Sequence, residues 1–505
     1  MKIYIKKFLA LVFFFIFAGM FFLNCTDRSR PVRITMLVLG NRPTNNRTSV
    51  VLREINKRLV SELNAELHLR HIEWSDWQTR YQLAFAAGDG SFDLAVTATD
   101  WLYGWELVRR GGFFPMTPEM LQENAPRTWE EVIPEHWEMC TLDGKIWFIP
   151  EDQYTQYTNH GVYWRGDWAR EGGIYQVTTF DELEAYFDVV KQNQPQAYPW
   201  DVAGDPGGGL LNGYLTSNTN TQGILSASIF CYNNDDPYTV VCPYMDSDAM
   251  IDAAIMFNRW SQKGFWREDV MNYRGLTRDL FFAGFSGADA HHTMTYYSSI
   301  RPGMDRLQPG SDVQFFYFGM ENNNVRKDII THGAMAINAT SRNPDLALRV
   351  YDLLRNDKEI YMLLNYGIYG EDYLINSEGK LERPEGWEAV THGLATNFWA
   401  GRMDKYTPLD ANWWSGTEAL IEHFNSFAHE YPMLKFAFDD SNVGAELAAM
   451  NNVLVSQIGQ IGFGRTRESP EQAVANLRRD LMAAGYEKVK AEVQAQLDAF
   501  WAANK

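Results

Sequence analysis

Hydrophobic residues follow two different periods along the first 100 residues of the chain. Residues 32–39, VRITMLVL, are almost all apolar, which is typical of a buried strand. Apolar residues at helical spacing follow, at Leu52, Ile55, Leu59, Leu63 and Leu67. Residues 67–74, LHLRHIEW, predict a second strand, 75–88 a helix, and 92–97, FDLAVT, a third strand. Strands that alternate with helices over short connections predict a mainly parallel sheet covered by helices on both faces.

Polar and aromatic residues follow these strands directly. In such sheets ligands bind beyond the carboxyl ends of the strands, where the loops converge. Asp100 and Trp101 come straight after the third strand, and Asn41 and Arg42 come straight after the first. We therefore expect these four side chains at the edge of a cleft.

The middle of the chain predicts a passage between two lobes. Residues 143–171 contain a turn, an extended run that breaks at Pro150, and a second extended run, a pattern that suits a crossing from one lobe to another. A helix follows, with Thr179 as its cap and Glu182 three residues later, which is the spacing of a capping box.

The second half of the chain is richer in helix. Residues 329–375 predict a short strand and then a helix that begins at Pro344 with Asn343 as its cap. Near the C-terminus one helix begins at Ser469-Pro470, and a last helix follows Gly485.

The first 25 residues have the layout of an export signal. Three lysines precede an unbroken run of 16 apolar or small residues, Phe8 to Leu23, which is shorter than the roughly 20 residues that a membrane-spanning helix needs. Cys25 resembles the lipidated cysteine of bacterial lipoproteins, with residues 1–24 as the signal peptide. Such sites usually have Gly, Ala or Ser before the cysteine, whereas Asn24 stands here. The alternative is that the segment remains as an uncleaved anchor.

Composition narrows the class of partner. The chain has 505 residues, 46% of them hydrophobic and 22% charged, which is typical of a globular protein with two or three domains. Its formal net charge is -19, and the leader contains lysines but no acidic residue. A surface this acidic repels nucleic acid, so we expect no nucleic-acid partner.

Three cysteines follow Cys25, and they do not indicate a metal site. Cys231 and Cys242 flank a turn-rich run that would bring them together, so either a disulfide or two free thiols would be consistent with the sequence. Cys140 would be a buried thiol. His291-His292 lacks carboxylates at ligand spacing, so we expect no metal and no cofactor.

Several strings resemble one family in order and spacing: FDLAVTATDW (92–101), GKIWFIPE (144–151), VYWRGDWAREGG (162–173), LLNYGIYGEDY (363–373) and LMAAGYEKVKAEVQAQLDAFWA (481–502). Together they are similar to the ABC-transporter extracellular solute-binding proteins of family 1, in the LplA-like lipoprotein subgroup with a DUF3502-type C-terminal domain. The family motif usually has Glu where this chain has Tyr369.

The resemblance implies an α/β fold of the two-lobed, type II periplasmic-binding-protein class, with a mainly parallel sheet flanked by helices in each lobe and a helical C-terminal region. It implies that lobe 1 comprises 32–155 and 330–390, that lobe 2 comprises 156–329 and 391–440, and that residues 436–505 form the C-terminal region. It also implies a monomer that is held by its N-terminal lipid at the outer face of the cell membrane or in the periplasm, beside an ABC permease.

Family 1 binders most often take carbohydrates, and sugars stack on aromatic rings while their hydroxyls bind polar side chains. The candidate ligand contacts are therefore aromatic and polar residues in predicted loops and crossings. They are Asn41, Arg42, Trp77, Asp100, Trp101, Tyr154, Gln156, Tyr157, Tyr296, Tyr297, Trp399, Arg402, Asn412, Trp413 and Trp414. Tyr296 and Tyr297 follow HHTMT (291–295), which resembles a strand of the second lobe.

The sequence thus predicts a solute-binding lipoprotein of an ABC importer for an oligosaccharide, without catalytic activity. One alternative is an exported carbohydrate-active enzyme such as a glycosidase, because paired carboxylates occur at Asp235-Asp236 and Asp439-Asp440. Another is a sensor or adhesin that has kept the binding fold.

Overall fold

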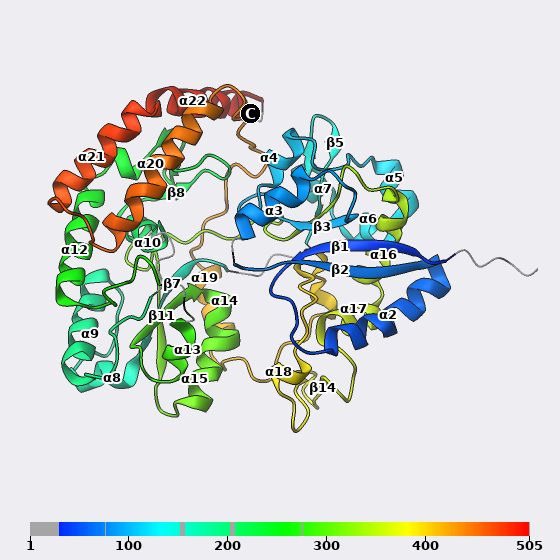
Figure 1. Ribbon diagram of the computed structural model, residues 1–505, viewed down its shortest axis with the longest axis horizontal. Coiled ribbons are helices and arrows are strands. Elements are labelled where there is room, and N and C mark those ends of the chain that lie inside the picture. The colour runs from blue at the N-terminus through cyan, green and yellow to red at the C-terminus, as the bar shows by residue number, and fades with distance from the viewer. Residues whose placement is uncertain are drawn as a thin grey trace, which may run out of the picture.

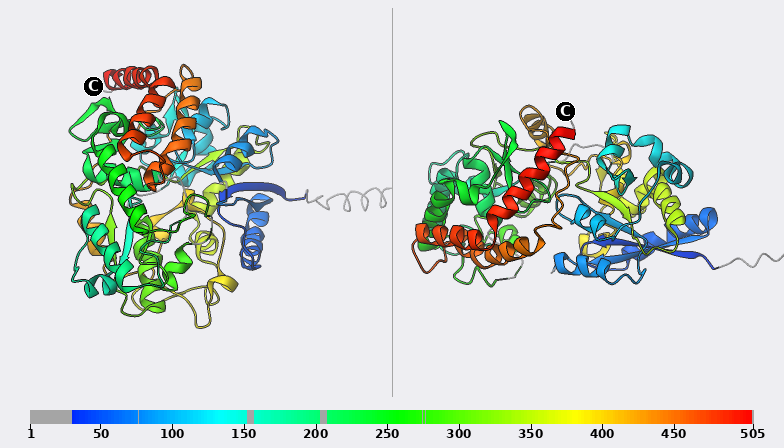
Figure 2. Two further views of the ribbon diagram at one scale, coloured as in Figure 1. Left: turned by 60° about the vertical axis from the view of Figure 1, so that its left-hand side comes forward. Right: turned by 90° about the horizontal axis from the view of Figure 1, so that it is seen from above.

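The protein consists of two lobes that lie side by side (Figure 1). The structure is a computed structural model that describes residues 30–75, 77–151, 157–202, 208–273, 275 and 277–503. Seen from above, helices surround each lobe and several chain segments pass between them (Figure 2). Most buried hydrophobic side chains fall into two large clusters, one in each lobe. The two-lobed α/β fold expected from the sequence is confirmed.

Lobe 1 is built on a five-stranded sheet with the order β2-β1-β3-β13-β6. Its strands are β1 (Val32–Leu39), β2 (Ala65–Ile72), β3 (Leu94–Thr97), β13 (Ala334–Ile337) and β6 (Ile149–Pro150). β1 runs parallel to β2 and β3, whereas β13 is antiparallel to both of its neighbours. The last four residues of β1 are fully buried because strands flank it on both sides and helices cover the sheet.

Helices of lobe 1 come from two distant parts of the chain. The first part gives α2 (Arg47–Leu63), α3 (Trp77–Ala86), α4 (Gly104–Arg109), α5 (Pro118–Asn124), α6 (Pro126–Glu131) and α7 (Pro134–Met139), followed by a hairpin of β4 (Thr141–Leu142) and β5 (Lys145–Ile146). The second part gives α16 (Pro344–Asn356), α17 (Lys358–Tyr366), β14 (Leu374–Ile375), β15 (Leu381–Glu382), α18 (Ala389–His392) and the 3-10 turns η2 (Trp399–Gly401) and η3 (Asp404–Tyr406).

Two details of lobe 1 differ from the sequence-based expectation. Leu67 lies in β2 rather than in the preceding helix, because α2 ends at Leu63 with Asn64 in the left-handed conformation. α16 begins at Pro344 as expected, but the Asn343 side chain makes no capping hydrogen bond.

Lobe 2 contains a three-stranded sheet with the order β11-β7-β12. Its strands are β7 (His160–Arg165), β11 (Ala288–His292) and β12 (Val313–Tyr317). Both outer strands are antiparallel to β7. The mainly parallel sheet that was expected for this lobe is therefore wrong: β11 and β12 each return beside β7 in the opposite direction.

The chain between β11 and β12 is helical. HHTMT does not form one strand, because β11 ends at His292 and α14 (Thr293–Thr295) begins there, with the His292 side chain as its cap. Tyr296 and Tyr297 lie in a π-helical turn, η1 (Tyr296–Ile300), which leads into α15 (Arg301–Leu307).

The other elements of lobe 2 pack around this sheet. They are α8 (Gly166–Glu171), α9 (Phe180–Asn193), α10 (Gly208–Asn218), β8 (Thr221–Gly223), β9 (Cys231–Asn233), β10 (Asp236–Val241), α11 (Pro243–Asp246), α12 (Ala249–Lys263), α13 (Thr277–Phe282) and α19 (Thr417–Asn425). Half of the predicted capping box of α9 is formed: the Thr179 side chain accepts from the Glu182 amide, but the Glu182 carboxylate accepts from Thr178 rather than from the Thr179 amide.

The hairpin of β9 and β10 brings the two cysteines near one another without joining them. Cys231 pairs with Val241, the residue before Cys242. Cys140, Cys231 and Cys242 are all free thiols in this structure, so of the two alternatives that the sequence left open for Cys231 and Cys242 the structure has the free thiols. Burial raises the pKa of Cys231 to about 12, and that of Cys242 likewise, which makes both poorly reactive.

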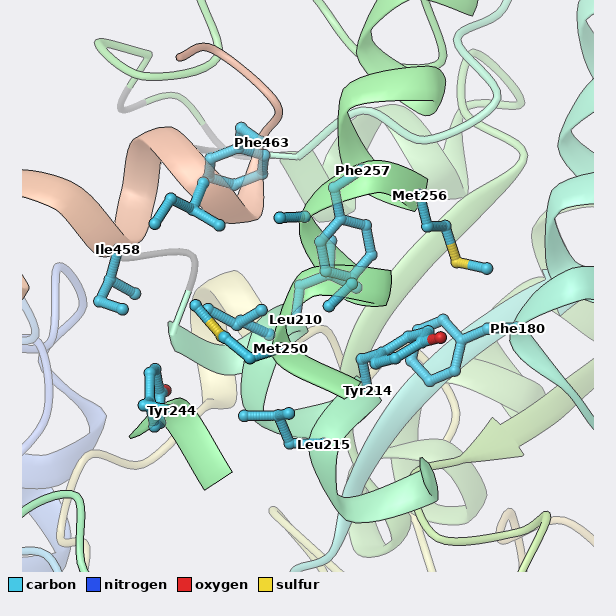
Figure 3. Close-up of a cluster of buried hydrophobic side chains, with 14 of the residues drawn as sticks. Phe180, Leu210, Tyr214, Leu215, Tyr244, Met250, Met256, Phe257, Ile458 and Phe463 are labelled. Atoms are coloured by element: carbon cyan, nitrogen blue, oxygen red, sulfur yellow. The ribbon is translucent and has the colours of Figure 1, made fainter. Parts of the chain in front are cut away.

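The C-terminal helices belong to lobe 2. These are α20 (Gly444–Gly462), α21 (Pro470–Ala483) and α22 (Tyr486–Ala503). Ile458 of α20 and the following Phe463 pack with Met250 and Phe257 of α12 in the lobe 2 core (Figure 3). The chain therefore enters β1 in lobe 1 and reaches its last helix in lobe 2. No helix of the described residues is long and apolar enough to cross a membrane.

The segment after α18 is divided between the lobes. Phe398 and Ala400 pack in the lobe 1 core, whereas Tyr431, Met433 and Phe436 pack in the lobe 2 core. The expectation that residues 391–440 lie in lobe 2 therefore does not hold for the first residues of that range. Arg109 of α4 donates to the backbone oxygen of Ala437 over 2.6 Å, so residues near 437 also contact lobe 1.

Candidate functional site: a cleft between the lobes

A cleft of about 740 Å³ lies between the two lobes. Lobe 1 contributes α3, α4 and the loop between β3 and α4, while lobe 2 contributes β8 with its following loop and the first half of α20. The residues that line it include Gln82, Asp100, Trp101, Tyr103, Glu106, Arg110, Gln222, Ser226, Arg326, Asp440, Leu447 and Asn451. Because both lobes line it, a change in their angle would change the volume of the cleft.

Four tryptophans of lobe 1 form one aromatic group, here called the tryptophan cluster: Trp74, Trp77, Trp101 and Trp399. Trp74 stacks on Trp399 with ring centroids 5.9 Å apart and planes 9° apart, and on Trp101 at 6.4 Å. Trp77 contacts Trp101 edge-on at 5.4 Å. Trp74 has 43% of its surface exposed, so part of its indole is open to solvent, and Trp101 is the member of the cluster that lines the cleft.

The sheet of lobe 1 explains why these rings meet. Trp74 follows the carboxyl end of β2 and Trp101 follows that of β3, and these parallel strands end at the same edge of the sheet. Trp399 comes from η2, which contacts β3 and β13. Three separate stretches of chain therefore place aromatic rings at one edge.

The loop that carries Asp100 and Trp101 is bonded to residues 331–333, which lead into β13. The Trp101 indole nitrogen donates to the backbone oxygen of His332 over 2.9 Å, and His332 Nδ1 lies 2.7 Å from Asp100 Oδ2. The Thr99 amide donates to the backbone oxygen of Thr331 over 3.1 Å. The other oxygen of Asp100, Oδ1, is buried and has no protein hydrogen-bond partner among the described residues.

His332 lies among three carboxyl groups. Burial alone would lower the pKa of His332, but Asp100, Asp328 and Glu151 outweigh burial and raise it to about 10. Burial raises the pKa of Glu151 to about 8 and that of Asp328 to about 7, although His332 acts in the opposite direction on both. His332 is therefore a cation at neutral pH.

Three histidines gather on the lobe 2 side of the crossings. The rings of His291 and His292 lie 4.2 Å apart, and His160 lies 5.2 Å from His291. Burial and the neighbouring histidines lower the pKa of His291 to about 3 and of His292 to about 2. These imidazoles are neutral at pH 7 and can both donate and accept hydrogen bonds.

The candidate residues of lobe 2 pack against one another. Tyr296 and Tyr297 are buried, and Trp413 and Trp414 pack against them at 5.2 to 5.3 Å between ring centroids. The Tyr296 hydroxyl donates to the backbone oxygen of Val313, which gives that ring a role in the lobe 2 core. Trp413 remains partly exposed.

The remaining candidates lie in several places. Asn41 Oδ1 accepts from the Trp74 amide over 3.2 Å, so it orients the tryptophan cluster, and Arg42 is exposed beside it. Asn412 is exposed and bonds Asp410. Arg402 pairs with Asp404 at 2.6 Å.

Of the candidate ligand contacts among the described residues, Asp100 and Trp101 line the cleft and the others lie outside its lining. Tyr157 is buried and lines a smaller pocket of about 250 Å³ with α7 and residues 327–330, where its hydroxyl donates to Asn425. Tyr154 and Gln156 fall outside the described residues, as does Cys25.

Most residues that line the cleft, among them Tyr103, Arg110 and Asn451, were not predicted from the sequence. Trp74 and His332, which contact Trp101, were not predicted either. Trp74 follows a strand, and the rule that selected Asp100 and Trp101 would have selected it as well. His332 precedes a strand, but that strand, β13, is antiparallel to β3, so its beginning meets the carboxyl end of β3. A rule based on parallel sheets cannot find such a residue. The described residues contain no group of three His, Cys, Asp or Glu side chains that is arranged to hold a metal ion.

Comparisons with known proteins place this architecture in a class. Residues 432–502 match the family model described as "Domain of unknown function (DUF3502)". A "Carbohydrate ABC transporter substrate-binding protein" of Streptococcus pneumoniae serotype 4 is 22% identical over 489 residues, which cover 93% of this chain and 91% of that relative.

Solved structures of similar fold cover both lobes. The N-glycan transport solute binding protein NgtS of Streptococcus pneumoniae, in complex with Man1GlcNAc, has a TM-score of 0.72 and 19% identity over 93% of this chain and 99% of that one. A human-milk-oligosaccharide-binding (HMO) solute-binding protein of Bifidobacterium longum infantis has a TM-score of 0.67 and 14% identity, with coverage of 93% and 99%. The alginate-binding protein AlgQ2 has a TM-score of 0.64 and 15% identity, with coverage of 94% and 99%.

Two α/β lobes around a cleft define the class of solute-binding proteins, and the chain has that fold. The resemblance to the ABC-transporter extracellular solute-binding proteins of family 1, with a DUF3502-type C-terminal domain, is confirmed.

Proposed function

We propose that this protein is the extracytoplasmic substrate-binding protein of an ABC importer, which captures an oligosaccharide between its lobes and delivers it to the permease. The observation that supports this most strongly is the tryptophan cluster, which lines a cleft between the two lobes through Trp101 and places the partly exposed Trp74 against that ring. A ligand that contacts both walls favours the closed arrangement, because only that arrangement makes all of its contacts.

The chemistry of the cleft suits a sugar. An apolar pyranose face stacks on an exposed indole, and Trp74 offers one. Hydroxyl groups need acceptors, and Asp100 Oδ1 lacks a protein partner at the same wall. The relatives that are named for their ligands bind glycans, human-milk oligosaccharide or alginate.

We further propose a neutral glycan as the ligand rather than an acidic one. Asp100, Glu106 and Asp440 line the cleft together with two arginines, Arg110 and Arg326. Burial raises the pKa of Glu106, and Arg326 lies 5.1 Å over the ring of Tyr431. A polyuronate needs an excess of cations along its path, and these residues do not supply one.

Isothermal titration calorimetry with a mannosyl-N-acetylglucosamine disaccharide, a fructo-oligosaccharide and an alginate oligomer tests both proposals. We expect binding of a neutral glycan with a rise in unfolding temperature. Chromatography of the recovered sugar separates binding from catalysis, since a glycosidase would release new reducing ends. Such release would refute the proposal of a binding protein, and preferential binding of alginate would refute the neutral ligand.

We also propose that Cys25 carries a lipid and that the mature protein is a monomer at the outer face of the cell membrane or in the periplasm. We propose in addition that each lobe comprises the chain segments that contribute to one of the two large hydrophobic clusters. Cys25 follows the apolar leader directly. Replacing it, in Cys25→Ser, should move the exported protein from the membrane fraction to the soluble fraction. Retention of Cys25→Ser in the membrane fraction would instead support an uncleaved anchor.

A further inference from the structure

Residues 331–333 lie where the ligand loop and both chain crossings meet. On one side they bond the loop that carries Asp100 and Trp101: Thr99 Oγ1 lies 2.6 Å from Thr331 Oγ1, in addition to the bonds from Thr99, Asp100 and Trp101 described above. On the other side the Glu151 amide donates to the backbone oxygen of Gly333 over 3.0 Å, and the Gly333 amide donates to Oε1 of the Glu151 side chain over 3.2 Å. Glu151 is the last described residue on the lobe 1 side of the first crossing.

His332 is the side chain at the centre of this junction. Its backbone oxygen accepts a hydrogen bond from the Trp101 indole, and its Nδ1 is hydrogen-bonded to Asp100, so His332 contacts both residues of the ligand loop. Asp328, four residues earlier, bonds Thr158 on the lobe 2 side of the first crossing. The segment 328–333 therefore connects the ligand loop of lobe 1 to the beginning of lobe 2.

We propose that His332 is the positioning residue that fixes the Asp100–Trp101 loop against the crossings, so that a glycan stacked on the tryptophan cluster acts on the angle between the lobes. The effect of the glycan rests on the proposed function, whereas the positioning of the loop by His332 does not. His332 need not touch the sugar.

The surroundings of His332 favour a permanent cation there. Asp100, Asp328 and Glu151 face it from the ligand loop, the second crossing and the first crossing, and all three raise its pKa. His160 and His292 face it from β7 and β11; burial is the main cause that lowers the pKa of each, and the charge on His332 lowers it further. Arg402, on the lobe 1 side, lowers the pKa of Glu151 as His332 does, so both cations are attracted to the same carboxyl group. Of these groups Asp100 makes the direct contact with the imidazole, over 2.7 Å, and this charge-assisted hydrogen bond ties the ligand loop to the second crossing.

Hydrogen–deuterium exchange of the ligand-free full chain tests the positioning. His332→Leu removes the donor to Asp100, whereas His332→Asn retains a donor near the position of Nδ1 and carries no charge. We expect exchange in peptides that contain Thr99 to Trp101 to become at least about tenfold faster in His332→Leu, with partial rescue in His332→Asn. His68→Leu is the matched control, because the partly exposed His68 also lies beside a carboxylate, 3.7 Å from Glu66, but on β2 and outside the junction.

An unchanged exchange rate in His332→Leu, or an equal change in His68→Leu, would overturn the proposal. If His332→Leu does not fold, the comparison of His332→Asn with wild type decides. Imidazole NMR of the wild-type protein gives an independent reading: we expect His332 to remain doubly protonated through pH 8, and titration near the ordinary histidine value of about 6.5 would contradict its place among three carboxyls.

Affinity for the mannosyl-N-acetylglucosamine disaccharide then tests the coupling. We expect His332→Leu to bind about tenfold more weakly than wild type, which lies within the usual range of coupling between sites, with His332→Asn in between. Equal affinity in all three proteins would show that the junction does not act on the ligand. If wild type binds no glycan, the proposed function fails, while the exchange experiment still judges the role of His332.

Discussion

At the scale of single residues, Trp74 and Trp101 differ in exposure, so their replacement should affect ligand binding and folding stability differently. Trp74 is 43% exposed, whereas Trp101 packs against Trp74, Trp77 and Trp399 and donates a hydrogen bond to His332. Trp101 is thus part of the structure of lobe 1 as well as of the cleft wall. Its replacement by alanine should reduce both stability and affinity.

Trp74→Ala is the sharper test of sugar stacking. We expect ligand affinity to fall by about 1–3 kcal/mol, the usual loss for a central aromatic contact, because the exposed indole is removed. The unfolding temperature of the ligand-free protein should change little. Calorimetric titration and a thermal melt measure the two quantities.

Tyr175→Ala is the control for this change, since Tyr175 is 79% exposed and follows α8 in lobe 2, outside the cleft lining. It should bind sugar as wild type does. Equal affinity of Trp74→Ala and wild type would remove Trp74 from the site.

Part of this site could be predicted because the hydrophobic pattern of the sequence shows where the strands end. Asp100, Trp101 and Asn41 follow strands, and the structure places all three at one edge of the lobe 1 sheet. Tyr296 and Trp414 were selected as loop or strand aromatics, yet they pack on one another. Packing between residues more than 100 positions apart decides which aromatic rings are open, and no local pattern records it.

At the scale of elements, α9 and α12 of lobe 2 are joined through one carboxylate. Glu184 accepts from Arg259, from the Trp260 indole over 2.8 Å and from Lys263 over 2.7 Å. Burial alone would raise the pKa of Glu184, but these three donors lower it to about 2. The charged carboxylate therefore stabilises the folded lobe.

Glu184→Gln should lower the free energy of unfolding by about 2 kcal/mol at pH 7, since the hydrogen bonds to a charged acceptor are lost. Because the folded pKa lies below the ordinary value of 4.5, the stabilisation is complete above pH 4.5 and is lost as pH falls toward 2. Urea unfolding at several pH values should thus show the difference between the two proteins shrinking over that range.

Glu54→Gln serves as the matched control, because Glu54 pairs with Lys57 within α2 at the surface. An exposed pair of this kind contributes about 0–1 kcal/mol. A difference for Glu184→Gln that stayed constant from pH 7 to pH 3 would contradict the role of its charge.

The elements themselves were predicted to different degrees. The apolar run of β1, the capped start of α9 and the Ser469 cap of α21 lie where the sequence placed them, because each depends on neighbouring residues. The antiparallel sheet of lobe 2 was missed, since strand direction depends on how β11 and β12 return to β7. The end of β11 at His292 was missed as well, because the His292 side chain caps a helix that begins within the run HHTMT, which resembles a strand.

At the scale of the whole molecule, the two large cores are separate. One cluster draws on residues from Ile34 to Ala400 and the other on residues from Val162 to Leu497, and no buried residue belongs to both. The lobes are joined by crossing segments and by contacts such as that of Arg109 with Ala437. Each lobe therefore has a hydrophobic core of its own.

Differential scanning calorimetry of the ligand-free protein should resolve two overlapping transitions, because separate cores unfold with limited coupling. A glycan that contacts both lobes should raise the lower transition and bring the two together. A single ligand-free transition with equal calorimetric and van't Hoff enthalpies would contradict two independently cooperative lobes.

The described chain begins at the edge of lobe 1 and its last helix, α22, lies in lobe 2 (Figure 2). Fluorophores attached near Arg33 and near Ala502 would therefore lie on opposite lobes. The native thiols at 140, 231 and 242 have raised pKa values, so engineered surface cysteines would react first with maleimide dyes. Energy transfer between dyes near the two ends of the described chain would then report the movement of the lobes in single molecules.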